Sequence, residues 1–162
     1  MPEIPRLLDQ LRRAFDGEPW CGPSLMTNLK GVTATQAAQY PIENAHSIWE
    51  IVVHVAGWSE VVRRRIAENQ PLQAGDAEDW PPQPEQLTEA NWQAARATLH
   101  TAHEQLLAFV ATLPEAELDR TIGATFEPPQ GDSYTAYQML HGVAQHYLYH
   151  AGQVVLLRKR LQ

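Results

Sequence analysis

Four stretches of this chain carry apolar residues three and four positions apart, and prolines separate the stretches. That spacing places apolar side chains along one face of a helix. The second stretch covers about residues 47–69 and stops before Pro71, and the third covers about residues 88–113 and stops at Pro114. Proline has no backbone donor and clashes with the preceding turn, so a helix ends there. We therefore predict an all-α fold, a four-helix bundle of the up-and-down type.

The first and fourth stretches complete this set of helices. The first covers about residues 5–30 and is interrupted at residues 17–23, where two prolines and two glycines should break or offset it. The fourth runs over about residues 133–161. Long proline-rich connections lie at residues 71–84 and 127–131, and long connections in a compact domain are often functional.

Length and charge restrict the classes of protein to consider. The 162 residues fit one domain, 1–162, and the formal net charge is −7 with no run of Lys or Arg before residues 158–160. Sequence-independent binding of nucleic acid is therefore not expected. No basic leader precedes an apolar run, and no apolar stretch reaches the roughly 20 residues of a membrane span. The lone Cys21 cannot form an internal disulfide, which fits a reducing compartment. Together with the lack of a leader and of a membrane span, this makes us expect a cytoplasmic protein without membrane partners. Five tryptophans are many for such a domain, and exposed ones favour a homodimer.

Two histidines, His54 and His150, stand where helix periodicity puts apolar residues, and a third, His146, lies one turn before His150. His146 and His150 are four apart, so they project from one helical face, and His54 belongs to the apolar stripe of the second helix. Burying an imidazole costs free energy unless its nitrogens have partners. One such histidine alone would be read as a core residue bonded to a neighbour. Three of them, on two helices, indicate a shared metal ion.

Glu50 and His141 are the candidates for moving a proton at this site. Glu50 lies one turn before His54 and could orient its imidazole or accept a proton, or it could serve only the capping box with Ser47. His141 is five residues before His146, an offset that favours an outer or packing role over ligation.

The remaining polar candidates have alternative readings. His46 could line the mouth of a pocket or be solvated before its helix. Cys21 could be a soft fourth ligand, a redox-sensitive thiol or an inert residue of a turn. His100 and His103 flank the apolar seam of the third helix and are expected at its surface or boundary.

Two segments resemble the DinB/YfiT-like superfamily. They are residues 45–58, which contain His46-Ser47-Ile48-Trp49-Glu50 and His54, and residues 140–154, which contain His146-x3-His150-Ala151-Gly152-Gln153. The resemblance covers essentially the whole chain and implies a four-helix bundle, commonly dimeric, in which three histidines hold a divalent metal such as zinc, nickel or iron. On this sequence the implied ligands are His54, His146 and His150. Relatives that share a Trp-x-Gly-Pro-Ser segment, here residues 20–24, often carry histidine at the position of Cys21.

An ion held by three neutral imidazoles keeps coordination positions open, as in catalytic sites. An open position lowers the pKa of bound water toward about 7 or holds a thiol as thiolate. The resemblance adds that some branches of the family transfer low-molecular-weight thiols. We expect a metal-dependent transferase or hydrolase acting on a small molecule. The alternatives are a non-catalytic, stress-associated module that binds a metal or ligand, and a metal-free bundle whose histidines satisfy one another.

The up-and-down arrangement also predicts how the second and fourth helices run relative to each other. The second and fourth helices would run parallel, so aligning His54 with His146 and His150 would start the fourth helix about 12 Å beyond the start of the second. That overhang would form a pocket wall, roofed by residues 121–132 and the segment around Cys21.

Overall fold

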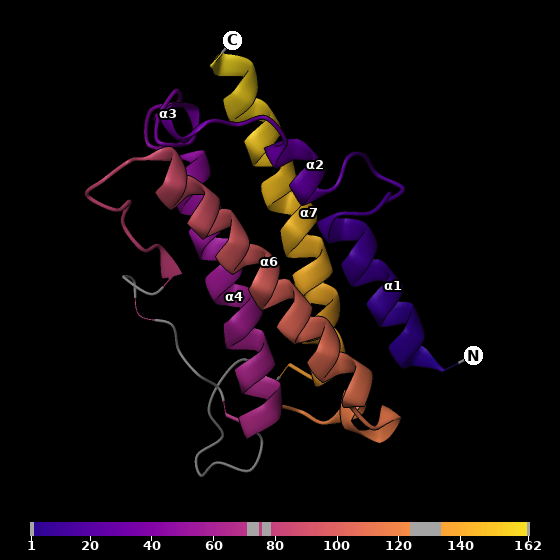
Figure 1. Cartoon of the computed structure of the whole chain (residues 1–162). Helices are drawn as coiled ribbons and strands as arrows, with labels where there is room; N and C mark the ends of the chain where they lie inside the picture. Colours follow the sequence, from indigo (N-terminus) through magenta and orange to yellow (C-terminus); the bar gives the residue numbers. More distant parts are fainter. Residues whose placement is uncertain (1, 71–74, 76–78, 124–133, 162) are drawn as a thin grey trace.

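The chain folds into helices joined by irregular connections (Figure 1). The computed structural model describes residues 2–70, 75, 79–123 and 134–161. Their helices are α1 (Glu3–Phe15), α2 (Leu25–Leu29), α3 (Ala34–Ala37), α4 (Ile48–Glu68), α6 (Glu89–Thr112), the 3-10 helix η1 (Glu115–Asp119) and α7 (Ala136–Arg160). The described residues contain no strand, only an isolated bridge between Thr121 and Thr135. The all-α prediction is confirmed. None of these helices is long and apolar enough to cross a membrane.

The four long helices contact one another as a closed ring. Helix α4 packs against α6 and α7, and α1 packs against the same two helices from the other side. In Figure 1, α1 and α7 run upward and α4 and α6 run downward. The ring of neighbours is the one expected of a four-helix bundle.

The directions of the helices differ from the up-and-down prediction. Trp49 and Trp92 pack against each other near the starts of α4 and α6, with ring centroids 5.2 Å apart, so these two helices are parallel. The connection of residues 69–88 makes this possible, because twenty residues can extend ~60 Å, about twice the length of α4. An up-and-down connection would have needed only a short turn.

Helices α4 and α7 are therefore antiparallel, and the parallel prediction is wrong. Arg120, shortly before α7, donates from its guanidinium to the Ile66 carbonyl at the end of α4 at 2.7 Å. The predicted overhang of α7 beyond the start of α4 does not exist, and most of its predicted roof, residues 124–132, lies outside the described residues.

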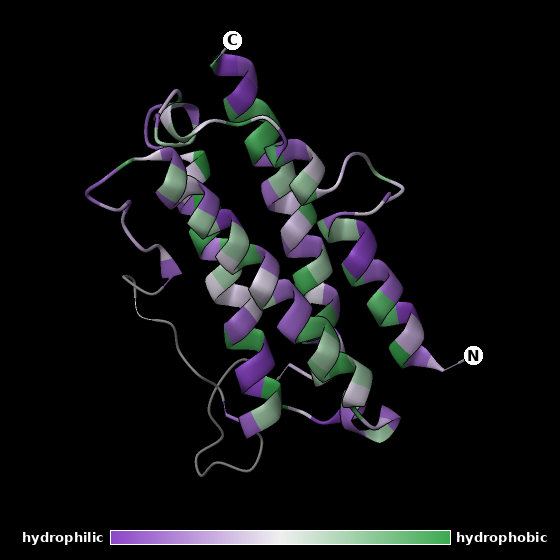
Figure 2. Ribbon diagram, viewed as in Figure 1, coloured by the Kyte–Doolittle hydropathy of each residue, from purple (hydrophilic) through white to green (hydrophobic). Residues whose placement is uncertain are grey.

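The hydrophobic core is formed by all the long helices. Its largest fully buried side chains include Trp49, Trp92, Tyr147 and Phe15, one each from α4, α6, α7 and α1. Hydrophobic and hydrophilic residues alternate along each long helix (Figure 2). Apolar faces that meet in this way supply most of the stability of a helical domain.

The predicted helix boundaries agree closely with the structure. The first stretch is broken where its prolines and glycines lie, into α1 and α2. Helix α7 begins after the cap Thr135, whereas the predicted start, residue 133, lies outside the described residues. The short α3 and η1 were not predicted, because four or five residues show too little periodicity.

The start of α4 is fixed by a capping box with an added tertiary bond. Ser47 Oγ accepts from the Glu50 backbone N–H at 3.1 Å, and Glu50 Oε2 accepts from the Ser47 N–H at 2.8 Å. The Gln83 amide also donates to Ser47 Oγ at 2.7 Å. This buried serine therefore ties the connection of residues 69–88 to the helix that carries His54.

We predict that Ser47→Ala lowers the free energy of unfolding by about 1–2 kcal/mol, because the cap and the Gln83 bond are both lost. Thr88→Ala is the matched control, since Thr88 Oγ1 caps α6 through the Asn91 N–H alone, and it should cost about 0.5–1 kcal/mol. Urea denaturation measures both. Equal costs for the two variants would contradict this account of the α4 start.

Candidate metal centre

Three imidazoles meet between α4 and α7. His54 Nε2 lies 3.0 Å from His146 Nε2, and His150 Nε2 lies 2.9 Å from the same atom. Among the described residues these three form a group whose ligand atoms all lie within 4.8 Å of one another. Two nitrogens bonded to one zinc ion are at most about 4.2 Å apart, because each Zn–N bond is about 2.1 Å. The structure thus brings together the three predicted ligands.

Sequence spacing and helix direction explain why the rings converge. His146 and His150 lie one turn apart on α7, so both face α4. His54 lies near the start of α4, which runs beside the second half of α7 because the two helices are antiparallel. One imidazole from α4 therefore meets a pair from α7.

The second nitrogen of two rings is held by an oxygen acceptor. His54 Nδ1 lies 2.6 Å from the Asp79 carbonyl oxygen, and His150 Nδ1 lies 2.6 Å from Gln153 Oε1. An oxygen acceptor at this distance requires the proton on Nδ1, which leaves a lone pair on each Nε2. Both lone pairs point at His146 Nε2, which carries at most one proton when neutral. The imidazoles cannot all satisfy one another, and a cation at their meeting point would accept every lone pair.

Burial keeps the three imidazoles neutral. His54 and His150 are 4% and 3% exposed, and His146 is partly buried. Burial lowers the pKa of His54, although the Asp79 carbonyl opposes that shift. Burial followed by the neighbouring His150 and His54 lowers the pKa of His146 to about 3, and burial lowers the pKa of His150 to about 4. Neutral imidazole is the form that binds a metal, so the folded chain presents it ready at neutral pH.

Residues of the connection between α4 and α6 orient His54. Asp79 Oδ1 accepts from Trp58 Nε1–H at 2.6 Å and lies 3.2 Å from His54 Nδ1. The Trp80 ring stacks on His54, with centroids 3.8 Å apart and planes 6° apart. The same ring also stacks on His46, with centroids 3.5 Å apart. Sequence reasoning missed Asp79 and Trp80, because an irregular connection has no periodicity that would mark them.

Two cavities reach the imidazoles. The larger, about 840 Å³, is lined by His54, His146, Asp79 and aromatic side chains that include Trp58, Tyr134 and Tyr137. The second, about 590 Å³, is lined by all three imidazoles together with His46, Trp80 and apolar residues of α7. His46 therefore lines a pocket, as one of its two readings expected.

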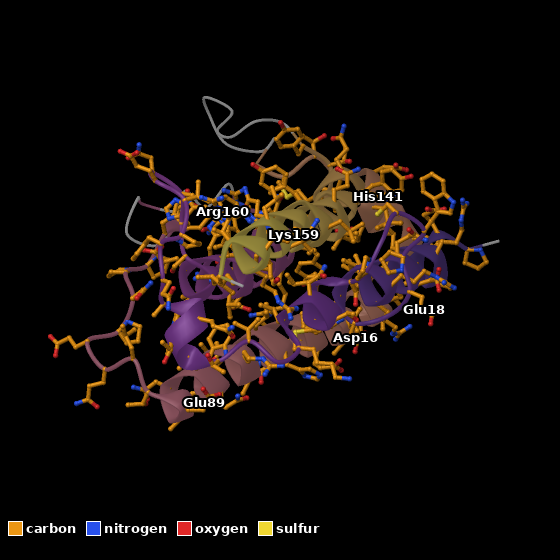
Figure 3. The ribbon with its side chains drawn as sticks, turned by 90° about the horizontal axis from the view of Figure 1, so that it is seen from above. Asp16, Glu18, Glu89, His141, Lys159 and Arg160 are labelled. Atoms are coloured by element: carbon orange, nitrogen blue, oxygen red, sulfur yellow. The ribbon has the colours of Figure 1, made fainter. Side chains whose placement is uncertain are left out.

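The two predicted proton carriers lie in different surroundings. Glu50 is engaged in the cap of α4, and its other oxygen accepts from the Tyr40 hydroxyl at 2.8 Å. His141 lines the larger cavity, and its Nε2 is buried without a hydrogen-bond partner among the described residues. It lies on α7, far from the end marked by Lys159 and Arg160 (Figure 3). A catalytic role stays a prediction for both residues.

The other polar candidates lie apart from the three-histidine group. Cys21 is a free, exposed thiol between α1 and α2 and does not belong to the group. His100 is exposed as predicted, but His103 is 1% exposed and stacks on Phe15 with centroids 3.8 Å apart. The prediction for His103 is wrong because α1 covers that face of α6, and periodicity within one helix does not reveal which neighbour covers it.

Comparison with known proteins identifies the fold and the family of the chain. The fold is similar to that of a crystal structure described as a conserved protein from Enterococcus faecalis, with a TM-score of 0.69 and 19% sequence identity over 99% of this chain and 97% of that chain. No curated protein matches the chain. The sequence pattern of the DinB superfamily matches residues 24–154, which include all three histidines. This match covers most of the sequence, and the chain therefore belongs to the DinB superfamily.

Proposed function

We propose that His54, His146 and His150 hold one divalent metal ion, zinc, nickel or iron, in an enzyme that acts on a small molecule. The observation that carries the proposal is the convergence of three neutral imidazoles, two of them with Nε2 lone pairs fixed by oxygen acceptors on Nδ1. Oriented, partly enclosed imidazoles with open space beside them are typical of catalytic rather than structural metal sites.

The favoured reaction is thiol transfer to an electrophile, with hydrolysis as the related possibility. A metal ion bound here would supply a thiolate or hydroxide at neutral pH. The chain's own residues hold and orient the ligands and enclose the substrate. In the transfer, sulfur bonds to the electrophilic carbon, the leaving group departs with its electron pair, and the thiol proton passes to a base. His141 is our candidate base. It lines the larger cavity, and its Nε2 has no hydrogen-bond partner among the described residues.

The lining of the larger cavity bears on the substrate. Its described lining residues include several aromatic rings and one carboxylate, Asp79, and no Lys or Arg. Aromatic walls suit a substrate with an apolar body. We therefore propose a small-molecule substrate with an apolar body. We also propose that the chain acts in the cytoplasm as a homodimer.

Glu50 is the weaker candidate for proton transfer, because both its oxygens accept hydrogen bonds. Glu50→Gln separates its two roles, since glutamine also completes a capping box but cannot accept a proton as a carboxylate does.

Turnover of a small thiol with a chromogenic aryl halide by the zinc-loaded protein is the test of enzymatic function. Catalysis that survives Glu50→Gln and falls in His141→Phe would support His141. Metal binding without turnover of any thiol, ester or amide would favour the non-catalytic module.

We predict that the wild-type chain binds one equivalent of Ni²⁺ or Zn²⁺ and that His150→Ala weakens binding by more than about 100-fold, because a ligand is lost rather than an outer residue. Elemental analysis and calorimetric titration of the metal-free protein measure this. His100→Ala is the control, since His100 is exposed and outside the group. Unchanged stoichiometric binding by His150→Ala would refute the ligand assignment.

We also predict a shallow pH dependence of metal affinity. Protons compete with a metal only below the pKa of the imidazole, and burial lowers the pKa of His146 to about 3 and of His150 to about 4. Between pH 7.5 and 5.5 the Ni²⁺ affinity of folded protein should therefore fall by less than about tenfold. Three imidazoles with the ordinary pKa of about 6.5 would lose about 1,000-fold over the same range. A loss of that size in calorimetric titrations would show that the ligands are not buried as described.

A further inference from the structure

A buried polar network lies beside the three imidazoles and joins α4, α6 and α7. Tyr147, the residue after His146 on α7, is fully buried. Its hydroxyl lies 2.9 Å from Ser59 Oγ on α4 and 3.3 Å from His103 Nδ1 on α6. Ser59 and His103 are each 1% exposed, so water does not compete for these bonds.

The donors of this network can be assigned along the chain of contacts. The Ser59 hydroxyl donates to the Val55 carbonyl one turn earlier, at 2.9 Å. Its oxygen must then accept the proton of the Tyr147 hydroxyl, because Ser59 has only one proton to give. The Tyr147 oxygen in turn accepts from His103 Nδ1–H. The hydroxyls of Ser59 and Tyr147 therefore each donate one hydrogen bond and accept one. In the bond between α4 and α7, Tyr147 is the donor and Ser59 is the acceptor.

The hydrogen bond between Tyr147 and Ser59 joins the same two helices that carry the three imidazoles. Ser59 follows His54 by five residues on α4, and Tyr147 adjoins His146 on α7. The apolar side chains that the two helices contribute to the core, such as Val52, Val55 and Val154, are held by contacts without directional preference. A hydrogen bond weakens steeply when its distance or angle changes, so this one resists sliding of α4 along α7. Metal–nitrogen bonds tolerate only about 0.2 Å, whereas a slide by one residue is about 1.5 Å.

We propose that Tyr147 and Ser59 are positioning residues for the metal centre: their hydrogen bond fixes the register of α4 on α7 that brings His54 Nε2 to His146 and His150. Neither side chain belongs to the three-histidine group. The inference rests on the proposed function, because it assumes that the three imidazoles bind a metal.

The test is a double-mutant cycle on metal affinity. Tyr147→Phe removes one oxygen and keeps the ring that packs on Phe15, and Ser59→Ala removes the acceptor. Titration with Co²⁺, followed by its visible absorption, measures both the affinity and the geometry of the site. We expect each variant to bind Co²⁺ about tenfold more weakly, at the lower end of outer-residue effects, with an altered spectrum. The double variant should be no weaker than the weaker single variant, because both remove one bond.

Ser24→Ala is the matched control. Ser24 is also fully buried, and its hydroxyl bonds to Thr27 Oγ1 at 2.9 Å at the start of α2, so this bond does not join α4 to α7. It should lower stability while leaving the Co²⁺ affinity and spectrum unchanged, which separates loss of stability from loss of register.

Three results would overturn the inference. If folded Tyr147→Phe and Ser59→Ala proteins bind Co²⁺ as the wild type does, the network only supplies hydrogen-bond partners to buried polar groups and does not position the imidazoles. Independent, multiplying effects of the two substitutions would show that they do not act through one bond. A wild-type protein that binds no Co²⁺ would overturn the proposed function as well, so the two failures are distinguishable. If Tyr147→Phe fails to fold, Ser59→Ala and its control decide alone.

Discussion

The antiparallel contact between α4 and α7 is the constraint on which the candidate site depends. This contact places the His54 imidazole of α4 against the His146 and His150 pair of α7. The contact is built from apolar side chains and from directional bonds at two levels: the guanidinium of Arg120 near the end of α4 and the Tyr147 hydroxyl in the middle. Register and ligand geometry are therefore properties of the same packing.

The lone pairs of the three imidazoles cannot all find hydrogen-bond donors among themselves, and a bound cation would accept them. Burial lowers their pKa values and so keeps the rings neutral, while the Asp79 carbonyl and the Gln153 amide oxygen direct two Nε2 lone pairs toward a third ring. In a metal-free protein such an arrangement leaves at least one polar atom poorly satisfied, which costs free energy. Binding proteins accept such a cost where it prepares a site for its ligand. The flanking cavities then give the site access to a small molecule.

The helices and the three histidines that lie together could be predicted from the sequence, but the surroundings of these histidines could not. Periodicity, prolines and caps such as Ser47 act within a few residues, so helix limits can be read from the chain. The four-residue spacing of His146 and His150 likewise fixes their common face. The direction of α6, the covering of His103 by α1 and the roles of Asp79 and Trp80 depend on how a long connection returns along the bundle. Local patterns contain no information on that path, so the up-and-down topology was predicted wrongly.

The central claim is that His54, His146 and His150 share one metal ion. The most direct measurement is a crystal structure of zinc-loaded protein, with anomalous scattering recorded on both sides of the zinc absorption edge. The account predicts one strong peak about 2.0–2.1 Å from the Nε2 atoms of all three residues. A peak bound elsewhere, or rings that turn apart with no zinc between them, would contradict it.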